Sequence, residues 1–317
     1  MPAIEHVLDF SDGPAYLHAR LGQLLIERDG QEVVTVPLEE VAAVVVSHPA
    51  VRYAHSVLAG LAEHGGAFIV CDPRHLPAAI LTPVQGHHTQ AERFAVQAAA
   101  RAPLKKRLWR QVVRAKILAQ AELLEQVSGK PSGLKAMAAR VRSGDAGNLE
   151  AQAARRYWPA LMGKGFRRRF DAEDANRHLN YGYAIINATT ARAIAASGLH
   201  PALGIHHHNR YNAFCLASDL TEPFRPLVDR AVREWVTARG HDAPLDREAK
   251  THLLESITAR YNFQWEERSL FDILRRTAAS LAAVFDGRAK ELLLPEPRQL
   301  MADQSSDEGE HAQGGER

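Results

Sequence analysis

The chain has 317 residues, of which 46% are hydrophobic and 24% charged, and its formal net charge is +2. This length suffices for two domains with real cores. No apolar run approaches the length of a membrane span, and the N-terminal MPAIEHVLDF lacks the features of a signal peptide. The two cysteines, Cys71 and Cys215, argue against a disulfide scaffold. We therefore predict a cytoplasmic protein without membrane association.

The charge is unevenly distributed along the chain. Residues 303–317 carry five acids and one base, a net of −4, so the remainder carries +6. A body with basic patches and a small acidic tail is compatible with binding a polyanion. A soluble protein with a solvated basic face explains the same charge equally well.

Residues 1–84 have the pattern of a small β-rich domain with one helix. The predicted strands are short apolar runs over residues 24–26, 33–36, 41–46, 67–71 and 78–81. Asp29-Gly30 between the first two runs predicts a hairpin. A helix is predicted over residues 53–64, ending at Gly65. The domain has no glycine-rich phosphate loop, so we predict that it serves assembly or docking.

The rest of the chain has a helical pattern. Residues 85–92 are predicted to be a linker, 93–298 an all-α catalytic domain, and 299–317 a polar, disordered tail, giving an α+β protein. The predicted helices cover residues 94–100, 104–126, 149–157, 178–197, 224–238, 246–259 and 264–285. Asn148 precedes the third of these helices and is predicted to cap it.

Two basic segments suggest contacts with phosphates. The helix over residues 104–126 can lay its basic side chains on phosphates, or it can be a core helix with a solvated basic face. These side chains are Lys105, Lys106, Arg107, Arg110, Arg114 and Lys116. The segment GKGFRRRF interleaves Arg167, Arg168 and Arg169 with aromatic residues. Such a cluster suits contacts with phosphates and unstacked bases.

Residues 203–226, LGIHHHNRYNAFCLASDLTEPFRP, carry groups that can hold a metal ion. These are Asp219, Glu222 and a histidine from the run His206-His207-His208. Neighbouring residues of a helix point about 100° apart, so at most one or two of the histidines bind one ion. Magnesium prefers oxygen ligands, whereas manganese accepts an imidazole more readily.

The spacing of this stretch predicts its local structure. We predict a helix over residues 209–217 that begins near the histidines, then a turn carrying Asp219 and Glu222, and a second helix from Pro223. Two acids three residues apart lie on one side of a helix or turn. Acids near a helix start are also favoured by the helix dipole alone, so simple capping remains the alternative.

Three segments of the second half, LEAQAARRYW, LNYGY and LGIHHHNRYNAFCLASDLTEPFRPLVD, resemble the signature segments of a known family in order and interval. This is the universal CRISPR-associated adaptation endonuclease, the integrase that installs new spacers during antiviral defence. The resemblance covers nearly the whole chain. The segments WRQVVRAKILAQ and EPFRPLVD make the chain most similar to the type II branch.

The resemblance implies a set of site residues. The family's metal ligands and catalytic residues fall on Glu150, His207 and Glu222. A further acid of the family falls on Asp219, which would orient a ligand from behind the metal site. The two histidines that flank His207 depart from the family pattern. The implied cofactor is Mg²⁺ or Mn²⁺.

The resemblance also implies an activity and partners. The 3′-hydroxyl of a captured DNA fragment attacks a phosphodiester at the edge of a CRISPR repeat, while Arg225 or the loop over residues 167–169 neutralises neighbouring phosphates. The family acts as a homodimer joined through the β-rich domains, and two such dimers flank a dimer of a small companion adaptation protein. Loss of one carboxylate ligand is expected to remove activity at little cost in stability, because carboxylates without metal repel one another.

Two other interpretations fit parts of the sequence. One is a general metal-dependent nuclease that acts on branched or single-stranded nucleic acid in repair. The other is a DNA-binding scaffold in which the acids only cap helices. Joining of a 3′-hydroxyl strand into a duplex separates the integrase from the nuclease, and insensitivity to a chelator identifies the scaffold.

Overall fold

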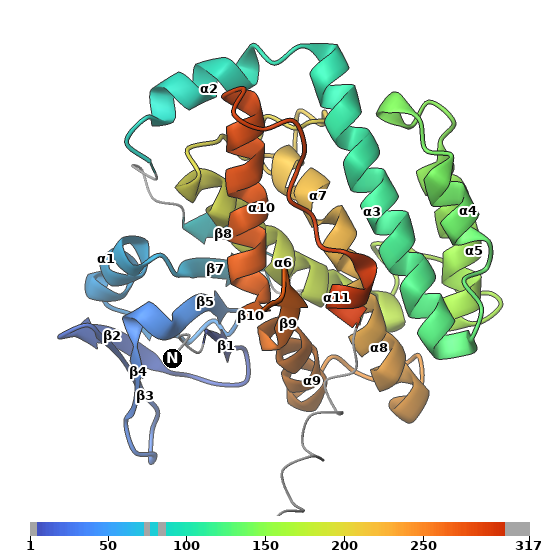
Figure 1. Cartoon of the computed structure of the whole chain (residues 1–317). Coiled ribbons are helices and arrows are strands. Elements are labelled where there is room, and N and C mark those ends of the chain that lie inside the picture. Colours follow the sequence, from blue (N-terminus) through green and yellow to red (C-terminus); the bar gives the residue numbers. More distant parts are fainter. Residues whose placement is uncertain (1–4, 73–76, 82–86, 302–317) are drawn as a thin grey trace, which may run out of the picture.

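The computed structural model describes residues 5–72, 77–81 and 87–301, and Figure 1 shows the N-terminal strands on one side of the molecule and most of the helices on the other. The strands are β1 (His6–Phe10), β2 (Tyr16–Arg20), β3 (Gln23–Glu27), β4 (Val34–Pro37), β5 (Val41–Val46), β6 (Arg52–Tyr53), β7 (Ala67–Cys71), β8 (Pro77–Leu81), β9 (Arg260–Phe263) and β10 (Glu266–Ser269). The α-helices are α1 (His55–His64), α2 (Gln90–Ala98), α3 (Ala102–Ser128), α4 (Leu134–Ala139), α5 (Leu149–Met162), α6 (Ala175–Ala196), α7 (Cys215–Thr221), α8 (Arg225–Arg239), α9 (Arg247–Thr258), α10 (Leu270–Phe285) and α11 (Pro297–Met301). Short 3₁₀ turns occupy Leu38–Glu40, Ser143–Asp145 and Glu222–Phe224.

The N-terminal part contains two four-stranded sheets. The first has the strand order β1-β5-β7-β8, in which β1, β5 and β7 are parallel and β8 is antiparallel to β7. The second has the order β4-β3-β2-β6 and contains the predicted hairpin of β3 and β4. Gly30 in that hairpin loop has φ 71°, a conformation that glycine adopts without steric cost.

Strand β5 reads VAAVVV because both of its faces are buried. Val44 and Val46 belong to the core between the two sheets, whereas Ala43 and Val45 belong to the core of the helical part. A continuous apolar run is the pattern of a central strand in a covered parallel sheet. The first sheet is therefore a wall shared by the two cores, which fixes the β-rich part against the helices.

Helix α6 is the centre of the helical part, and α7, α8, α9 and α10 pack around it. Most of its residues are buried. Gly182 allows α8 to approach closely, since a Cβ at this position would lie 2.4 Å from Cγ1 of Val228. This close packing sets the position of α8, whose start adjoins Glu222.

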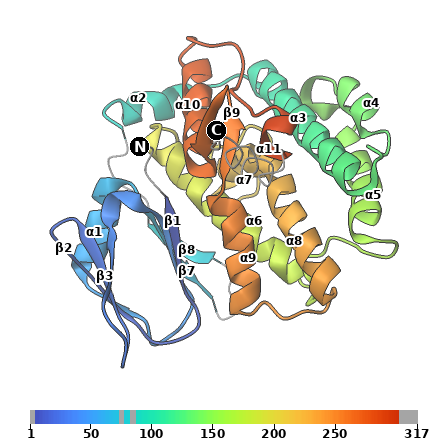
Figure 2. The same ribbon diagram turned by 60° about the horizontal axis from the view of Figure 1, so that its bottom comes forward.

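The two parts meet where β1 lies beside α9 (Figure 2). The hydroxyl of Tyr181 donates to Oδ2 of Asp9 at 2.6 Å, and Nζ of Lys250 donates to Oγ of Ser11 at 2.7 Å. Each bond joins a helix of the second half to the first strand or the turn after it. These polar contacts supplement the shared sheet in holding the two parts together.

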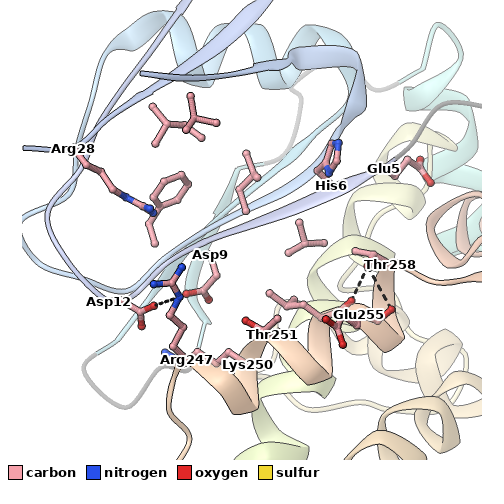
Figure 3. A pocket seen from close by; sticks show the side chains of 16 residues that line it. Glu5, His6, Asp9, Asp12, Arg28, Arg247, Lys250, Thr251, Glu255 and Thr258 are labelled. Atoms are coloured by element: carbon pink, nitrogen blue, oxygen red, sulfur yellow. Dashed lines mark hydrogen bonds and ion pairs between the residues drawn. The ribbon is translucent and has the colours of Figure 1, made fainter. Parts of the chain in front are cut away.

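A cleft of about 470 Å³ remains beside this contact, as Figure 3 shows. Asp9, Asp12 and Arg28 line it from the β-rich part, and Arg247 and Lys250 line it from α9. Nε of Arg247 lies 3.6 Å from Oδ2 of Asp12 across the cleft. Charges of both signs therefore alternate along its walls, so it lacks the single sign of charge that would favour a polyanion.

The predicted class, a β-rich part followed by a mostly helical part, is confirmed. The predicted strands over residues 41–46, 67–71 and 78–81 are present as β5, β7 and β8. The predicted helix over residues 53–64 begins two residues later, because Tyr53 pairs with β2 in strand β6. Its predicted end is confirmed, since Gly65 closes α1 in the left-handed conformation.

The predicted helix over residues 264–285 is wrong in its first six residues. They belong to the β9–β10 hairpin, and α10 begins only at Leu270. Gln264 and Trp265 at the turn have φ values of 53° and 67°, which an α-helix excludes. The helical part is therefore not all-α.

Two predicted boundaries fall partly outside the described residues. Residues 85 and 86 of the predicted linker are not described, and α2 already begins at Gln90. Residues 302–317 of the predicted tail are likewise not described, while its first residues belong to α11. Among the described residues, no helix has the length and apolar character needed to cross a bilayer.

The close packing of α6 on α8 can be tested through Gly182. We expect Gly182→Ala to lower the free energy of unfolding by about 1–3 kcal/mol, because the added methyl overlaps Val228. Urea denaturation measures this loss. In a double-mutant cycle, Val228→Ala should recover about 1 kcal/mol of it. Purely additive effects would show that the contact does not limit the approach of α8.

Candidate active site

Two predicted ligand residues lie on either side of a lysine. Glu150 extends from the first turn of α5, Glu222 begins the 3₁₀ turn between α7 and α8, and Lys116 comes from the middle of α3. Nζ of Lys116 lies 2.6 Å from Oε1 of Glu150 and 2.6 Å from Oε2 of Glu222. Both carboxylates therefore meet at one positive charge.

Glu222 is the more deeply buried of the two carboxylates, with 4% of its side chain exposed. Its Oε1 pairs with Arg225 at 3.1 Å. Its Oε2 is buried and lies 2.6 Å from Nζ of Lys116, which donates a hydrogen bond to it. Burial works to raise the pKa of Glu222, but Arg225 and Lys116 outweigh it and hold the pKa below its ordinary value.

The pKa of Lys116 depends on the same two opposing effects, burial and opposite charges, as the pKa of Glu222. Burial alone would lower the pKa of this lysine, whereas Glu222 and Glu150 raise it and prevail. The ammonium is therefore retained in its charged form although only 12% of the side chain is exposed.

The backbone at the start of α5 is fixed by a carboxylate that the sequence did not single out. The amides of Leu149 and Glu150 donate to the two oxygens of Asp145 at 2.9 and 3.0 Å. Asn148, the predicted cap, makes no side-chain cap and has φ 49°. The prediction was wrong because Asp145 is held in the preceding 3₁₀ turn, from which its carboxylate reaches the free amides.

The segment between the histidines and Glu222 also differs from its prediction. Helix α7 covers only Cys215–Thr221, so Asp219 lies inside a helix and the histidines lie in a loop. The side chains of Asn209 and Asn212 accept hydrogen bonds from the amides of Tyr211 and Phe214, at 2.9 and 2.8 Å. Such turns compete with helix formation, which is why the predicted helix over residues 209–217 fails in its first half.

Asp219 organises the histidine loop. It is fully buried and accepts hydrogen bonds from the amides of Ile205, His206 and His207 at 2.6, 3.0 and 3.1 Å. Gly204 makes this turn possible, because a Cβ there would lie 2.4 Å from the carbonyl oxygen of His207. One carboxylate thus replaces the hydrogen bonds that the loop would otherwise make with water.

The same carboxylate orients one imidazole. Nδ1 of His207 lies 2.6 Å from Oδ1 of Asp219, so Nδ1 carries the proton and Nε2 keeps its lone pair in the neutral ring. This hydrogen bond is the largest cause of the raised pKa of His207. A carboxylate behind a histidine is the usual way in which a ligand ring is held toward a metal.

The flanking histidines are placed differently. The ring of His206 stacks on Trp109 with 4.2 Å between centroids and 3° between planes, and burial lowers its pKa. His208 is exposed. Of the three histidines, therefore, only His207 has the buried acceptor that suits a metal ligand.

A basic cleft of about 860 Å³ opens beside Lys116. Arg167, Arg168 and Arg225 all line it, together with the aromatic residues Trp158, Phe166 and Tyr183. Arg169, the remaining arginine predicted to bind nucleic acid, is exposed and lies 3.5 Å from Asp171. The structure thus brings three of the four predicted arginines to the cleft that Lys116 also lines, and one of them, Arg225, pairs with Glu222.

Two of these arginines are held by a buried aromatic ring. The guanidinium carbons of Arg168 and Arg225 lie 5.4 and 4.8 Å from the ring centroid of Tyr183. The hydroxyl of Tyr183 donates to Asp229, which also accepts from Tyr157 at 2.6 Å. Burial raises the pKa of Asp229 to about 6. These contacts fix two positive charges along the wall of the cleft.

The described residues contain no group of three His, Cys, Asp or Glu side chains close enough to hold a metal ion. The donor chemistry nevertheless fits a divalent cation. Two carboxylates converge on a positive charge, and His207 is near enough for its charge to lower the pKa of Glu222. The buried Oε2 of Glu222 already has a cation, the ammonium of Lys116, as its partner at 2.6 Å.

The sequence pattern did not indicate the position of Lys116. It is one of six basic side chains on a helix whose pattern fits either phosphate binding or a solvated basic face. A signal was present, however, because Lys116 lies three or four positions from Val112, Val113 and Gln120, all buried on the inner face of α3. A lysine on a buried helix face requires a buried counter-charge.

Comparison with known proteins identifies relatives over most of the chain. The sequence profile of the family described as CRISPR associated protein Cas1 matches residues 10–256. A protein of Neisseria meningitidis serogroup C (strain 8013), named CRISPR-associated endonuclease Cas1, is 37% identical over 277 residues, which are 86% of this chain and 90% of the relative.

Solved structures share the fold at lower identity. A casposase bound to its integration product is 17% identical, has a TM-score of 0.75, and is matched over 90% of this chain and 92% of its own. A chain of a Cas6-RT-Cas1–Cas2 complex is 19% identical, has a TM-score of 0.71, and is matched over 92% of this chain and 36% of its own.

The role of Asp219 in holding the histidine loop can be tested with Asp219→Asn. The amide oxygen cannot accept all four hydrogen bonds, so we expect the free energy of unfolding to fall by about 3 kcal/mol. The pKa of His207 in the metal-free protein should also fall, since Asp219 raises it. Chemical denaturation and NMR titration measure the two effects.

The control for this variant is Asp171→Asn, which removes an acid with 76% of its side chain exposed. We expect it to change neither stability nor the titration of His207. An Asp219→Asn variant that keeps the wild-type pKa of His207 would contradict the orienting role.

Proposed function

The chain belongs to the Cas1 family of CRISPR-associated endonucleases, and from this premise we propose which residues carry the chemistry. We propose that Glu150, His207 and Glu222 bind a divalent metal ion, with Asp219 behind His207. The observation that carries the proposal is the convergence of Glu150 and Glu222 on one buried positive charge at the end of a basic cleft.

The substrate we propose is DNA with 3′-hydroxyl ends. The solved casposase is described as bound to an integration product, and the basic cleft beside Lys116 suits a phosphate backbone. In the joining reaction, the 3′-oxygen of the fragment forms a bond to a phosphorus of the repeat. The attacking hydroxyl gives up its proton, the bond from that phosphorus to the 3′-oxygen of the neighbouring nucleotide breaks, and this leaving oxygen takes up a proton.

The chain's own residues position this substrate. Arg168 and Arg225, held by the ring of Tyr183, would neutralise phosphates that flank the reacting one. The Nδ1 hydrogen bond to Asp219 would keep Nε2 of His207 directed as a ligand. When bound, Mg²⁺ or Mn²⁺ would polarise the scissile phosphate and stabilise charge on the leaving oxygen.

We propose two protein partners. One is a small companion of the Cas2 type, since a similar chain occurs in a Cas6-RT-Cas1–Cas2 complex. The other is a second copy of this chain, bound through the β-rich part. Strand β4 is an edge of its sheet, and Leu21, Val33 and Val34 are 89%, 52% and 55% exposed. An apolar edge strand is a ready site for pairing with another chain. The predicted type II subtype and cytoplasmic location stay predictions.

The activity is tested with a branched DNA that mimics a half-joined fragment, incubated with Mg²⁺ or Mn²⁺ or with EDTA. Resolution of the branch with rejoining of the duplex strand supports the integrase. Nicking without rejoining supports a general nuclease. Binding of the DNA without any reaction under either metal supports a scaffold and contradicts the proposed metal site.

The first substitution for this assay is Glu222→Gln. We expect a loss of joining of 100-fold or more, on the order of a removed transition-state contact. The matched control is Glu234→Gln, an exposed acid on α8. Joining by Glu222→Gln at the wild-type rate would remove Glu222 from the site.

The structure changes the expected effect of this substitution on stability. Repulsion between the carboxylates predicted little cost, but Lys116 and Arg225 neutralise Glu222. Loss of its charge leaves two cations without their buried partner. Glu222→Gln should therefore lower the free energy of unfolding by about 3 kcal/mol in metal-free buffer.

The second copy is tested by Leu21→Asp and Val34→Asp, with Val127→Asp on α3 as the exposed control. Light scattering after gel filtration should give twice the 35.0 kDa chain mass for the wild type and control. The two β-rich variants should approach the mass of one chain, because a charge on edge strand β4 at Val34, or on the exposed β2–β3 turn at Leu21, opposes contact with a second copy. Unchanged masses would place the dimer contact elsewhere.

A further inference from the structure

We propose that Lys116 is an internal counter-cation that competes with the divalent metal ion for Glu150 and Glu222. In the metal-free protein its ammonium holds the two carboxylates together, and the metal must displace it. The inference rests on the proposed function, since it assumes that these carboxylates bind the metal. It assigns a positioning role to a residue that the family resemblance leaves unassigned.

The position of Lys116 supports a direct competition. Its Nζ lies 2.6 Å from an oxygen of each carboxylate, so the two oxygens are no more than twice that distance apart. A metal that binds both oxygens would have to occupy the space of the ammonium. A metal ion and an ammonium held side by side between the same carboxylates would repel one another strongly, because little water is present there to screen their charges.

The fold holds Lys116 in place between the two carboxylates. Its helix position is fixed by buried neighbours, including Val113 and Ile117, on a helix of 27 residues. Only 12% of its side chain is exposed. The basic cleft, which Lys116 itself lines, is open to a displaced ammonium. It would enter that cleft beside Arg225, so a cation without an anionic partner is costly there.

Arg225 cannot take over this role. Its contact is with the other oxygen of Glu222, at 3.1 Å, and its guanidinium lies over the ring of Tyr183. Among the described residues, the ion pairs join Glu150 to Lys116 alone. Removal of the lysine charge should therefore leave both carboxylates available to the metal. The metal would then no longer have to displace an ammonium.

The first experiment measures binding of Mn²⁺ by calorimetry, without DNA. We expect Lys116→Met to bind Mn²⁺ about tenfold or more tightly than the wild type, because the competing charge is gone. Lys116→Gln is the second variant, in case methionine disturbs the fold, and should show the same direction. Lys106→Met, which removes an exposed lysine of α3, is the matched control and should keep the wild-type affinity.

The second experiment needs no variant. Wild-type protein is treated with an acetylating reagent with and without Mn²⁺, and acetylation of each lysine is quantified by mass spectrometry. We expect acetylation of Lys116 to be slow in metal-free buffer, because its ammonium is paired and buried, and to become several-fold faster with Mn²⁺. Lys106 should react at the same rate under both conditions.

The outcomes separate this inference from the proposed function. If the wild type binds Mn²⁺ but the Lys116 variants bind it no more tightly, and Mn²⁺ leaves the acetylation of Lys116 unchanged, the competition is refuted while the metal site stands. If no protein binds Mn²⁺, or if Glu222→Gln binds it as well as the wild type, the assignment of the carboxylates fails and the inference fails with it.

Discussion

The ion pairs of Lys116 with Glu150 and Glu222 are the constraint on which the site depends. They join α3, α5 and the turn before α8, three elements that are far apart in the sequence. Buried ion pairs of this kind are weak evidence for stability, since a well-packed apolar replacement is often as stable. Their effect on geometry is clearer, because one ammonium keeps two carboxylates from different elements close together, as the proposed binding of a cation requires.

The histidine loop shows a second use of a buried carboxylate. Asp219 satisfies three consecutive backbone amides and one imidazole, so a single residue sets both the path of the loop and the orientation of the ring. This arrangement explains how three adjacent histidines can acquire different roles. The imidazole of His207 contacts the carboxylate, whereas the ring of His206 stacks on Trp109.

The sequence predicted those parts of the structure that depend on local pattern. The run VAAVVV predicted β5 because burial on both faces leaves a readable apolar stretch, and Gly65 predicted the end of α1. The β9–β10 hairpin was missed because Gln264 and Trp265 adopt positive φ without being glycine or asparagine. The short α7 was missed because side-chain turns at Asn209 and Asn212 compete with the helix.

Some features of the candidate site are likewise indicated by short sequence segments, whereas others depend on how the fold is packed. The family resemblance marked Glu150, His207 and Glu222, but nothing in its segments indicated that a lysine from α3 lies between two of them. That contact depends on how closely α8 approaches α6, which Gly182 permits, and on Asp145 fixing the first turn of α5. The first is a tertiary contact and the second a local one, and both are made by residues outside the proposed ligand set. The sequence therefore suffices to propose the ligands, whereas the lysine charge that two of them share is a property of the packed fold.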